Sequence, residues 1–308
     1  MANNAMIAFA DQLQKEMPSL KLQLDQPMSA LTTLRLGGPA DLLAEPAEED
    51  EVRRLLEMAQ AEEIPLTVIG RGSNLLVRDG GIRGLTLRLG PEMKNITLRG
   101  QDIDAGSGAA LPALAAFAAE NSLEGLAFAQ GIPGSLGGAV YMNAGAYGGE
   151  MSQVVTAVSG FDYSGRPFWY TGKDMGFSYR SSRLQIEEKI VTAVTLSLLP
   201  GDREEIQREM NEHQAARAEK QPLNEASAGS TFRRPKGAYA AELIERSGLK
   251  GYAMGNVAVS EKHAGFLVNR GGTATEFLAL MAYVQQRVME ETGFFLEPEV
   301  RILGEDPA

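Results

Sequence analysis

The feature that most constrains this fold is a run of 25 residues, 125–149, that contains eight glycines and no charged side chain. Its length and lack of charge fit a membrane-spanning helix. However, this density of glycine, together with Pro133, Gln130 and Asn143, is poorly tolerated in a helix that faces lipid. Glycine loses more conformational freedom on folding than any other residue. A run with this many glycines therefore indicates sharp turns, or places where the backbone closely approaches another group. We therefore predict a system of glycine-rich loops and no insertion into a membrane.

An earlier glycine loop, residues 70–74 (GRGSN), follows an apolar run at 65–69 and precedes another at 75–77. Backbone amides of successive glycines can form a nest for an anion. The loop is not a dinucleotide fingerprint, because the third glycine is missing and the next residues favour a strand over a helix. A tight turn explains the loop equally well. The candidate cofactor contacts are Gly70, Arg71, Gly72, Ser73, Asn74 and Leu75.

The denser glycine loops at 131–138 and 143–149 have the same two interpretations, tight turns or a binding loop. The chain has 29 basic and 40 acidic residues and a formal net charge of −11, so its field repels phosphate at long range. A charge-free loop rich in amides suits a large flat cofactor with a diphosphate, held between two neighbouring lobes. The candidate contacts are Gly131, Pro133, Gly134, Ser135, Gly137, Gly138, Asn143 and Gly145.

The same composition excludes several classes of function. Non-specific nucleic-acid binding requires clustered positive charge, which this acidic chain lacks. Cysteine is absent, which excludes disulfides, thiolate zinc sites and thiol catalysis. Two histidines, His213 and His263, offer little for a metal centre or a serine–histidine relay. No basic segment followed by an apolar one opens the chain as in a signal peptide, so we expect a cytoplasmic enzyme without metal.

Hydrophobic periodicity predicts an α+β protein in several bodies. We predict two N-terminal lobes at residues 1–85 and 86–205, a polar connector helix at 203–220, a compact domain at 215–294 and a C-terminal strand within 295–308. Thr273 and Glu276 have capping-box spacing and begin a long helix. Further helices are expected at 5–17, 49–64, 111–121 and 238–246, and strands at 65–69, 75–77, 85–89, 96–99, 102–105, 154–163, 190–199, 257–259, 266–268 and 298–303.

A short segment after the connector helix presents a candidate reactive hydroxyl. Gly229 and Pro235 bracket a turn that contains Ser230 and Arg234. A serine hydroxyl can deliver a proton if its conjugate base is regenerated through water, and Arg234 is a candidate anion contact. From spacing alone, a turn or a helix cap is the favoured explanation of Ser230.

Two other segments contain charged candidates. Arg180 follows Tyr179, and its planar guanidinium suits a carboxylate or a phosphate. Glu299 lies on the expected last strand, where it alternates with Val300. The simpler interpretation of Arg180 is a surface arginine, and that of Glu299 is an exposed carboxylate on an edge strand.

Eight short segments follow one another along the chain: 32–38 (TTLRLGG), 70–75 (GRGSNL), 131–138 (GIPGSLGG), 143–148 (NAGAYG), 179–180 (YR), 229–232 (GSTF), 260–265 (SEKHAG) and 296–301 (LEPEVR). Each alone is a modest signal, but together they extend over nearly the whole chain. In this order they make the chain resemble the UDP-N-acetylenolpyruvoylglucosamine reductases of bacterial cell-wall synthesis.

The resemblance implies an FAD-binding fold of the p-cresol methylhydroxylase type, with flavin between the two N-terminal lobes and substrate enclosed by the third domain. It implies that NADPH reduces the flavin and leaves, and that UDP-N-acetylglucosamine enolpyruvate is then reduced to UDP-N-acetylmuramate, a peptidoglycan precursor needed for cell shape and division. Ser230 matches the family's proton donor, and Arg180 and Glu299 match its charged pair, with Glu299 acting in its protonated form. The expected substrate contacts are Tyr179, Arg234 and Lys262.

The chain departs from the family's longer subtype, which has Lys-Asn where this sequence has Arg233-Arg234 and carries an extra tyrosine-bearing loop. We therefore interpret it as the shorter subtype. No histidine stands in a flavin-linking context, so FAD is expected to be non-covalent, and we expect a monomer. The alternatives are an FAD-dependent oxidase or dehydrogenase of the same fold acting on a hydroxy acid or sugar lactone, and a non-catalytic protein that binds a nucleotide sugar.

Overall fold

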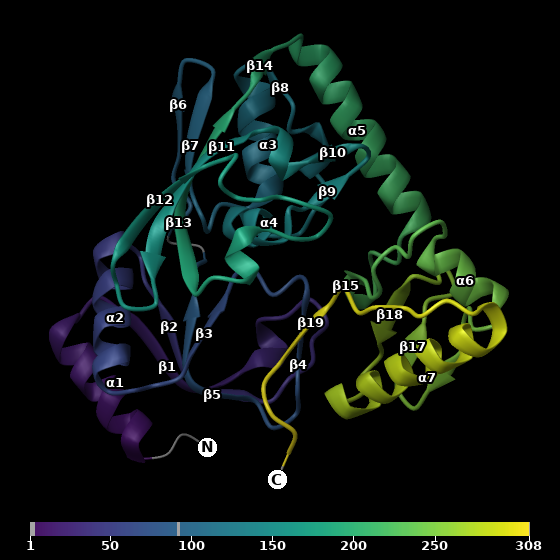
Figure 1. Ribbon diagram of the computed structural model, residues 1–308, viewed down its shortest axis with the longest axis horizontal. Coiled ribbons are helices and arrows are strands. Elements are labelled where there is room, and N and C mark those ends of the chain that lie inside the picture. Colours follow the sequence, from purple (N-terminus) through teal and green to yellow (C-terminus); the bar gives the residue numbers. More distant parts are fainter. Residues whose placement is uncertain (1–3, 91–92, 308) are drawn as a thin grey trace.

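The computed structural model describes residues 4–90 and 93–307 and contains three bodies, each with its own sheet and hydrophobic core (Figure 1). In the view of Figure 1 the first lobe lies at the lower left, the second at the top and the third domain at the lower right. The predicted α+β class is confirmed. The ends of the predicted division, residues 1–3 and 308, lie outside the described residues.

The first lobe is a four-stranded sheet covered by two helices. Its strand order is β1-β2-β5-β3, with β2, β5 and β3 parallel and β1 antiparallel at the edge. Apolar residues at helical spacing, such as Leu13 and Leu55, pack against Leu42 and Leu85 of the sheet. The elements are α1 (Asn4–Glu16), β1 (Lys21–Pro27), β2 (Pro39–Glu45), α2 (Glu49–Ala61), β3 (Leu66–Ile69), β4 (Leu75–Val77) and β5 (Ile82–Arg88), with a 3₁₀ turn η1 (Met28–Ala30).

Strand β5 passes through the boundary expected at 85/86. It lies between β2 and β3, and both Leu85 and Leu87 belong to the first core. A parallel strand with neighbours on both sides is buried on both faces, so this segment cannot begin the second lobe. We therefore place that boundary after residue 88, and the rest of the domain division stays a prediction.

The second lobe is built on a five-stranded antiparallel sheet of order β12-β11-β13-β7-β6. Helices α3 and α4 contribute to its core, which also includes Ile206 and Met210 of α5. Its elements are β6 (Ile96–Arg99), β7 (Asp102–Gly106), α3 (Leu111–Glu120), β8 (Leu123–Glu124), η2 (Ala127–Ala129), α4 (Leu136–Met142), β9 (Gly145–Ala146), β10 (Gly149–Glu150), η3 (Met151–Gln153), β11 (Val155–Asp162), β12 (Pro167–Thr171), η4 (Arg183–Gln185), β13 (Lys189–Ser197) and β14 (Leu199–Pro200).

The glycine-rich run forms η2, α4 and the β9–β10 hairpin, joined by turns. This confirms the prediction of a loop system over a single long helix. Within the described ranges, no helix has both the length and the apolar character needed to cross a membrane.

The third domain is a four-stranded sheet of order β15-β18-β17-β16, packed against the long helix α7. Thr273 and Glu276 form the predicted capping box, and α7 buries an apolar face made of Phe277, Leu280, Met281, Val284 and Val288. α5, visible as the long helix at the right of Figure 1, joins this domain to the second lobe. The elements are α5 (Arg203–Lys220), β15 (Ala226–Ser230), α6 (Ala240–Arg246), β16 (Ala253–Met254), β17 (Val257–Val259), β18 (Phe266–Asn269), α7 (Ala274–Thr292) and β19 (Arg301–Leu303).

The chain end returns from the third domain to the first lobe. Strand β19 pairs in parallel with β4, as the yellow segment beside β4 in Figure 1 shows. The third domain also contacts the first lobe through Asn269, whose Nδ2 donates to the carbonyl of Leu34 at 3.0 Å, and through Thr33, whose hydroxyl donates to the carbonyl of Ser227 at 2.7 Å. The first lobe and the third domain therefore meet around the start of β4.

Candidate active site

Ser230 lies at the end of β15, where the strand is irregular. The pairing register of β15 with β18 shifts between Ser227 and Ser230, and Gly229 between them has a φ of +77°. A bulge of this kind redirects the side chain that follows it, and a positive φ favours glycine at that position. The side chain of Ser230 is exposed, while its neighbour Thr231 is buried.

Arg180 lies at the tip of a tight turn in the second lobe. Ser178 and Ser181 exchange two backbone hydrogen bonds, of 3.0 and 3.1 Å, so Tyr179 and Arg180 form the tip. Arg180 has a φ of +55°. In this left-handed region the backbone of residues other than glycine is strained by about 1–2 kcal/mol. Asn143 supports the turn, because its Nδ2 donates to the carbonyl of Ser178 at 3.1 Å.

Arg180 and Glu299 form a half-buried ion pair across the second lobe and the C-terminal segment. The Nε of Arg180 donates to Oε1 of Glu299 at 2.7 Å, and the two side chains are 22% and 13% exposed. A second guanidinium nitrogen donates to the carbonyl of Gly145 at 3.1 Å. The structure thus brings together two of the predicted catalytic residues, which are 119 positions apart, and in this arrangement Glu299 accepts the hydrogen bond.

The backbone around Glu299 connects this pair to the serine and to the first glycine loop. The amide of Glu299 donates to the carbonyl of Thr231 at 2.8 Å, one residue from Ser230. The carbonyl of Glu299 accepts from Nδ2 of Asn74 at 3.1 Å, and the amide of Arg301 donates to the carbonyl of Asn74 at 2.9 Å. Segments from all three bodies therefore converge on one short stretch of chain.

The first and second glycine loops are in direct contact. A Cβ at Gly70 would lie 2.4 Å from Oγ of Ser135, and a Cβ at Gly134 would lie 3.7 Å from Oγ of Ser73. These loops, predicted to lie on neighbouring lobes, are face to face.

The first glycine loop offers unused backbone donors. In the described part of the chain, no backbone N–H from Arg71 to Asn74 donates a hydrogen bond to another protein group. Gly72 among them is buried and has a φ of +67°. Buried amides are normally paired, so this loop fits the diphosphate of a bound cofactor. Leu75, the last residue predicted there, begins β4.

Several glycines of the second loop are explained by contacts within the protein. A Cβ at Gly137 would lie 2.9 Å from Cβ of Ser107, and one at Gly145 would lie 2.6 Å from the carbonyl oxygen of Gly149. Asn143 is buried in a left-handed conformation at the end of α4, and its Oδ1 accepts from the amide of Ser152 at 2.9 Å. Their roles as cofactor contacts stay predictions, as do those of Gly138 and Pro133, which are exposed.

Arg217 lies against the second glycine loop. It belongs to the predicted connector helix and was not predicted as a site residue. A Cβ at Gly131 would be 2.3 Å from Cδ and 3.3 Å from Cζ of Arg217, so the guanidinium fills that space. Burial lowers the pKa of Arg217, partly offset by Tyr147. Within the described ranges its guanidinium has no hydrogen bond or ion pair. A helix that is polar all round can bridge two bodies, but nothing in the sequence distinguishes this arginine from others on α5.

Unpaired polar atoms occur at residues close in sequence to Arg217 and Gly131. Oε1 of Gln130, Nδ1 of His213 and Oε1 of Gln221 are buried and lack a hydrogen-bond partner among the described residues. His213 and Gln221 stand one helical turn before and after Arg217, and Gln130 precedes Gly131. Buried polar atoms without partners are uncommon and indicate a place that a polar ligand completes.

The predicted substrate contacts occupy two places. The backbone amide of Arg234 donates to the hydroxyl of Tyr179 at 3.3 Å, and its guanidinium lies 4.0 Å from the ring centroid of Tyr239. Tyr179 is part of the Arg180 turn, and Arg234 therefore lies next to that turn. Lys262 lies elsewhere, with its Nζ donating to the carbonyl of Ala218 in the last turn of α5 at 2.6 Å.

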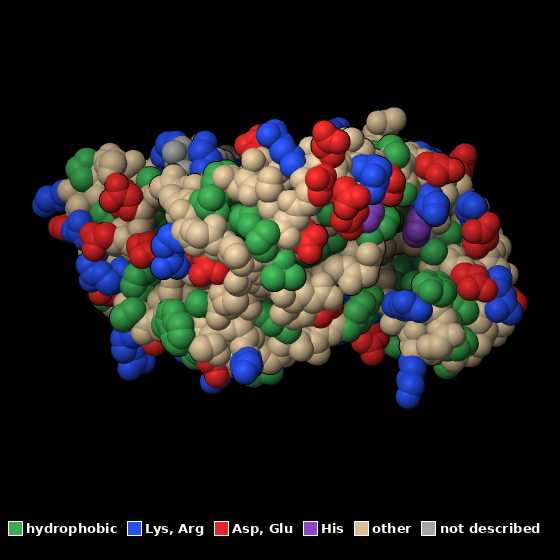
Figure 2. All heavy atoms as spheres, turned by 90° about the horizontal axis from the view of Figure 1, so that it is seen from above, with side chains coloured by type: hydrophobic (Ala, Val, Ile, Leu, Met, Phe, Trp, Pro, Cys, Tyr) green, Lys and Arg blue, Asp and Glu red, His purple; other side chains and the backbone are tan. Residues whose placement is uncertain are grey.

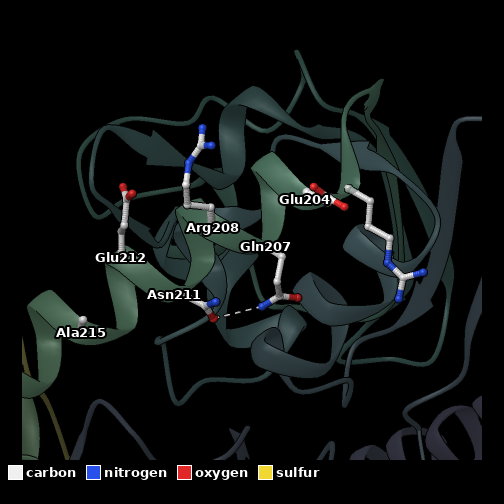
Figure 3. Close-up of a pocket in the computed structure, with 7 residues that line it drawn as sticks. Glu204, Gln207, Arg208, Asn211, Glu212 and Ala215 are labelled. Atoms are coloured by element: carbon white, nitrogen blue, oxygen red, sulfur yellow. Dashed lines mark hydrogen bonds between the residues drawn. The ribbon is translucent and has the colours of Figure 1, made fainter.

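A hollow of about 810 Å³ on the outer face of α5 is separate from this site. Its polar side chains, drawn in Figure 3, come from one helix, and Nε2 of Gln207 donates to Oδ1 of Asn211 at 3.1 Å. None of the predicted site residues lines it. It is open to solvent.

Comparisons with known proteins agree with this geometry. A family model described as the C-terminal domain of UDP-N-acetylenolpyruvoylglucosamine reductase matches residues 221–303, and an FAD binding domain model matches residues 40–169. The predictions of an FAD cofactor and of a p-cresol methylhydroxylase-type FAD-binding fold are confirmed.

Relatives match over nearly the whole chain. UDP-N-acetylenolpyruvoylglucosamine reductase from Caldanaerobacter subterraneus subsp. tengcongensis is 46% identical over 96% of this chain and 98% of its own, and the protein of the same name from Heliobacterium modesticaldum is 49% identical over 91% and 90%. The crystal structure of UDP-N-acetylenolpyruvylglucosamine reductase from Thermus caldophilus superposes with a TM-score of 0.79 at 39% identity, covering 92% of this chain and 98% of that one. The chain therefore belongs to the UDP-N-acetylenolpyruvoylglucosamine reductase family.

Proposed function

We propose that this protein reduces the enolpyruvyl double bond of UDP-N-acetylglucosamine enolpyruvate to give UDP-N-acetylmuramate, with NADPH as the electron donor. Support comes from the family and from the convergence of Ser230, Arg180 and Glu299 at the junction of three bodies. The observation that carries the proposal is the Arg180–Glu299 pair, connected through the Glu299 backbone to both Thr231 and Asn74.

The residues present fit bound FAD, because the amides of residues 71–74 lack protein acceptors and the two glycine loops face each other. The chemistry that bound FAD supplies is hydride transfer, first from NADPH and then to the methylene carbon of the enolpyruvyl group. The chain's own residues bind the substrate, stabilise the charge that develops beside its carboxylate, and provide the proton.

Arg180 and Ser230 have distinct roles in this proposal. Hydride addition makes an enolate-like dianion next to the substrate carboxylate, and a preorganised guanidinium at Arg180 stabilises it. Ser230 then donates its proton to the adjacent carbon and is reprotonated through water. The substrate carboxylate and Glu299 compete for the same guanidinium of Arg180.

An anaerobic absorbance measurement tests the function. The purified yellow protein should lose its flavin absorbance on addition of NADPH and regain it on addition of UDP-N-acetylglucosamine enolpyruvate. Colour that is lost and does not return with this substrate would favour a flavoenzyme with another acceptor. Protein that binds the sugar nucleotide but is not reduced by NADPH would favour a non-catalytic binding protein.

We infer that Arg217 holds a phosphate of the sugar nucleotide, since it is a half-buried cation without a protein partner in an acidic chain. A hydrogen bond to a charged group contributes about 1.5–3 kcal/mol, so Arg217→Gln should raise the KM for the sugar nucleotide roughly 10- to 100-fold. Steady-state kinetics checks this, with Arg208→Gln as the control, because Arg208 lies on the solvent side of the same helix. Loss of FAD from Arg217→Gln with an unchanged KM would assign the arginine to the cofactor instead.

The contact between the glycine loops predicts that a substitution in one loop can compensate for a substitution in the other. Gly70→Ala would place its Cβ 2.4 Å from Oγ of Ser135 but 3.6 Å from Cβ of Ser135. The single variant should therefore displace the Ser135 hydroxyl or separate the loops, and lose more FAD during purification than Ser135→Ala, while Gly70→Ala with Ser135→Ala should retain as much FAD as Ser135→Ala alone. The flavin-to-protein absorbance ratio measures this, with Ser135→Ala alone as the control for the lost cap of α4. Equal FAD loss in the single and double variants would contradict the proposed arrangement.

We further propose that the protein works in the cytoplasm as a monomer. Figure 2 shows acidic and basic side chains interspersed over the face it draws. The absence of cysteine suits a reducing compartment.

A further inference from the structure

Asp79, on the first lobe, caps the long helix of the third domain. Its Oδ1 accepts from the amide of Ala274 at 2.9 Å, and its Oδ2 accepts from the amide and the hydroxyl of Thr275 at 2.8 and 2.7 Å. Burial raises the pKa of Asp79, but the hydrogen bonds from Thr275 and Ala274 outweigh it, so the pKa is lowered overall. The carboxylate therefore interacts strongly with the positive end of α7.

The cap of α7 is divided between two bodies. The helix's own capping box satisfies the amide of Glu276 through Thr273, whose Oγ1 accepts at 3.1 Å. Among the described residues, the first two amides of the helix bond only to Asp79. Thr273 thus stabilises α7 from within its own domain, while Asp79 attaches the helix to the lobe that carries the first glycine loop.

The turn that holds Asp79 is rigid. The amide of Gly80 donates to the carbonyl of Glu305 at 2.9 Å, and the amide of Gly38 donates to the carbonyl of Arg78 at 3.0 Å, so chain segments pack on two sides. A Cβ at Gly38 would lie 2.1 Å from the carbonyl oxygen of Asp79. The position of Asp79 is therefore fixed relative to the first lobe.

Helix α7 in turn supports the strand that carries Ser230. It packs on β16, β17 and β18, and Phe266 of β18 is paired with Ser230. The amide of Leu267 donates to Oγ1 of Thr231 at 3.2 Å. A shift of α7 relative to the first lobe would therefore move Ser230 relative to the first glycine loop.

We propose that Asp79 is a positioning residue for the reduction step: by docking α7 on the first lobe it sets the distance between Ser230 and the reacting carbon. This rests on the proposed function. A displacement of about 1 Å can cost on the order of 100-fold in rate, whereas flavin reduction by NADPH does not use Ser230. Loss of Asp79 should therefore affect only one of the two half-reactions.

Stopped-flow measurement of both half-reactions tests this on FAD-loaded protein. Asp79→Ala should slow reoxidation of the reduced flavin by saturating UDP-N-acetylglucosamine enolpyruvate at least tenfold, while FAD content and the rate of reduction by NADPH stay within about twofold. Asp79→Asn keeps one acceptor oxygen and should fall between Ala and wild type. Thr273→Ala is the matched control: it removes a cap of the same helix without releasing it from the first lobe, and it should leave reoxidation unchanged.

The outcomes separate this proposal from the proposed function. If wild-type flavin is not reoxidised by the substrate, the function itself fails, and this inference with it. If wild type is active and Asp79→Ala reoxidises at the wild-type rate, positioning is contradicted. Equal slowing by Thr273→Ala and Asp79→Ala would also overturn the proposal, because it would show that only the stability of α7 matters.

Discussion

Ser230→Ala should slow reoxidation of the reduced flavin by UDP-N-acetylglucosamine enolpyruvate about 10²- to 10⁴-fold, the usual contribution of a positioned general acid. The rate at which NADPH reduces the flavin should not change, because hydride transfer to the flavin needs no proton from this hydroxyl. The bulge at Gly229 directs Ser230 out of the sheet, and alanine fits the same backbone. Rapid-mixing absorbance under anaerobic conditions separates the two rates.

Ser227→Ala is the matched control for this experiment. Ser227 lies on the same strand, and only its backbone carbonyl makes the contact with Thr33. The control should have wild-type rates in both half-reactions. If Ser230→Ala slows both half-reactions equally, the residue is not the proton donor, and a general disturbance of the junction would explain the loss.

Most of the helices and the class of fold could be predicted because their signals are local, but α4, inside the glycine-rich run, was not predicted. The α7 segment has a capping box and apolar residues at helical spacing, and both are present in the structure. Strands β1 and β2 were missed for physical reasons. β1 is a largely exposed edge strand, and β2 has Asp41 in its centre. Asp41 is 5% exposed and is neutralised by Arg83 of β5, a partner that no local pattern reveals.

The candidate site could be predicted only in part. The resemblance supplied Arg180, Ser230 and Glu299, and the structure pairs two of them through contacts between distant segments. Glycine was an ambiguous signal. Gly131 and Gly137 make room for Arg217 and Ser107, so at these positions a contact within the protein is enough to require glycine. Arg217 and Asp79 have no sequence signature, because each acts across a boundary between two bodies.

The left-handed backbone at Arg180 provides a test that separates strain from chemistry. Arg180→Gly and Arg180→Ala both remove the guanidinium, so both should slow reoxidation by about 10²- to 10³-fold, the effect expected for one preorganised donor. They differ in the backbone. Glycine adopts a φ of +55° freely, whereas alanine there costs about 1–2 kcal/mol.

Arg180→Gly should therefore be more stable than Arg180→Ala by about 1 kcal/mol, the reverse of the usual order of these two residues. Thermal unfolding of the two variants measures the difference, and stopped-flow absorbance measures their activity. Both leave Glu299 without its partner, so that cost cancels between them. Equal stability would show that the turn relaxes without the arginine. A higher reoxidation rate in one variant would mean that the backbone conformation, and not only the guanidinium charge, contributes to the reaction.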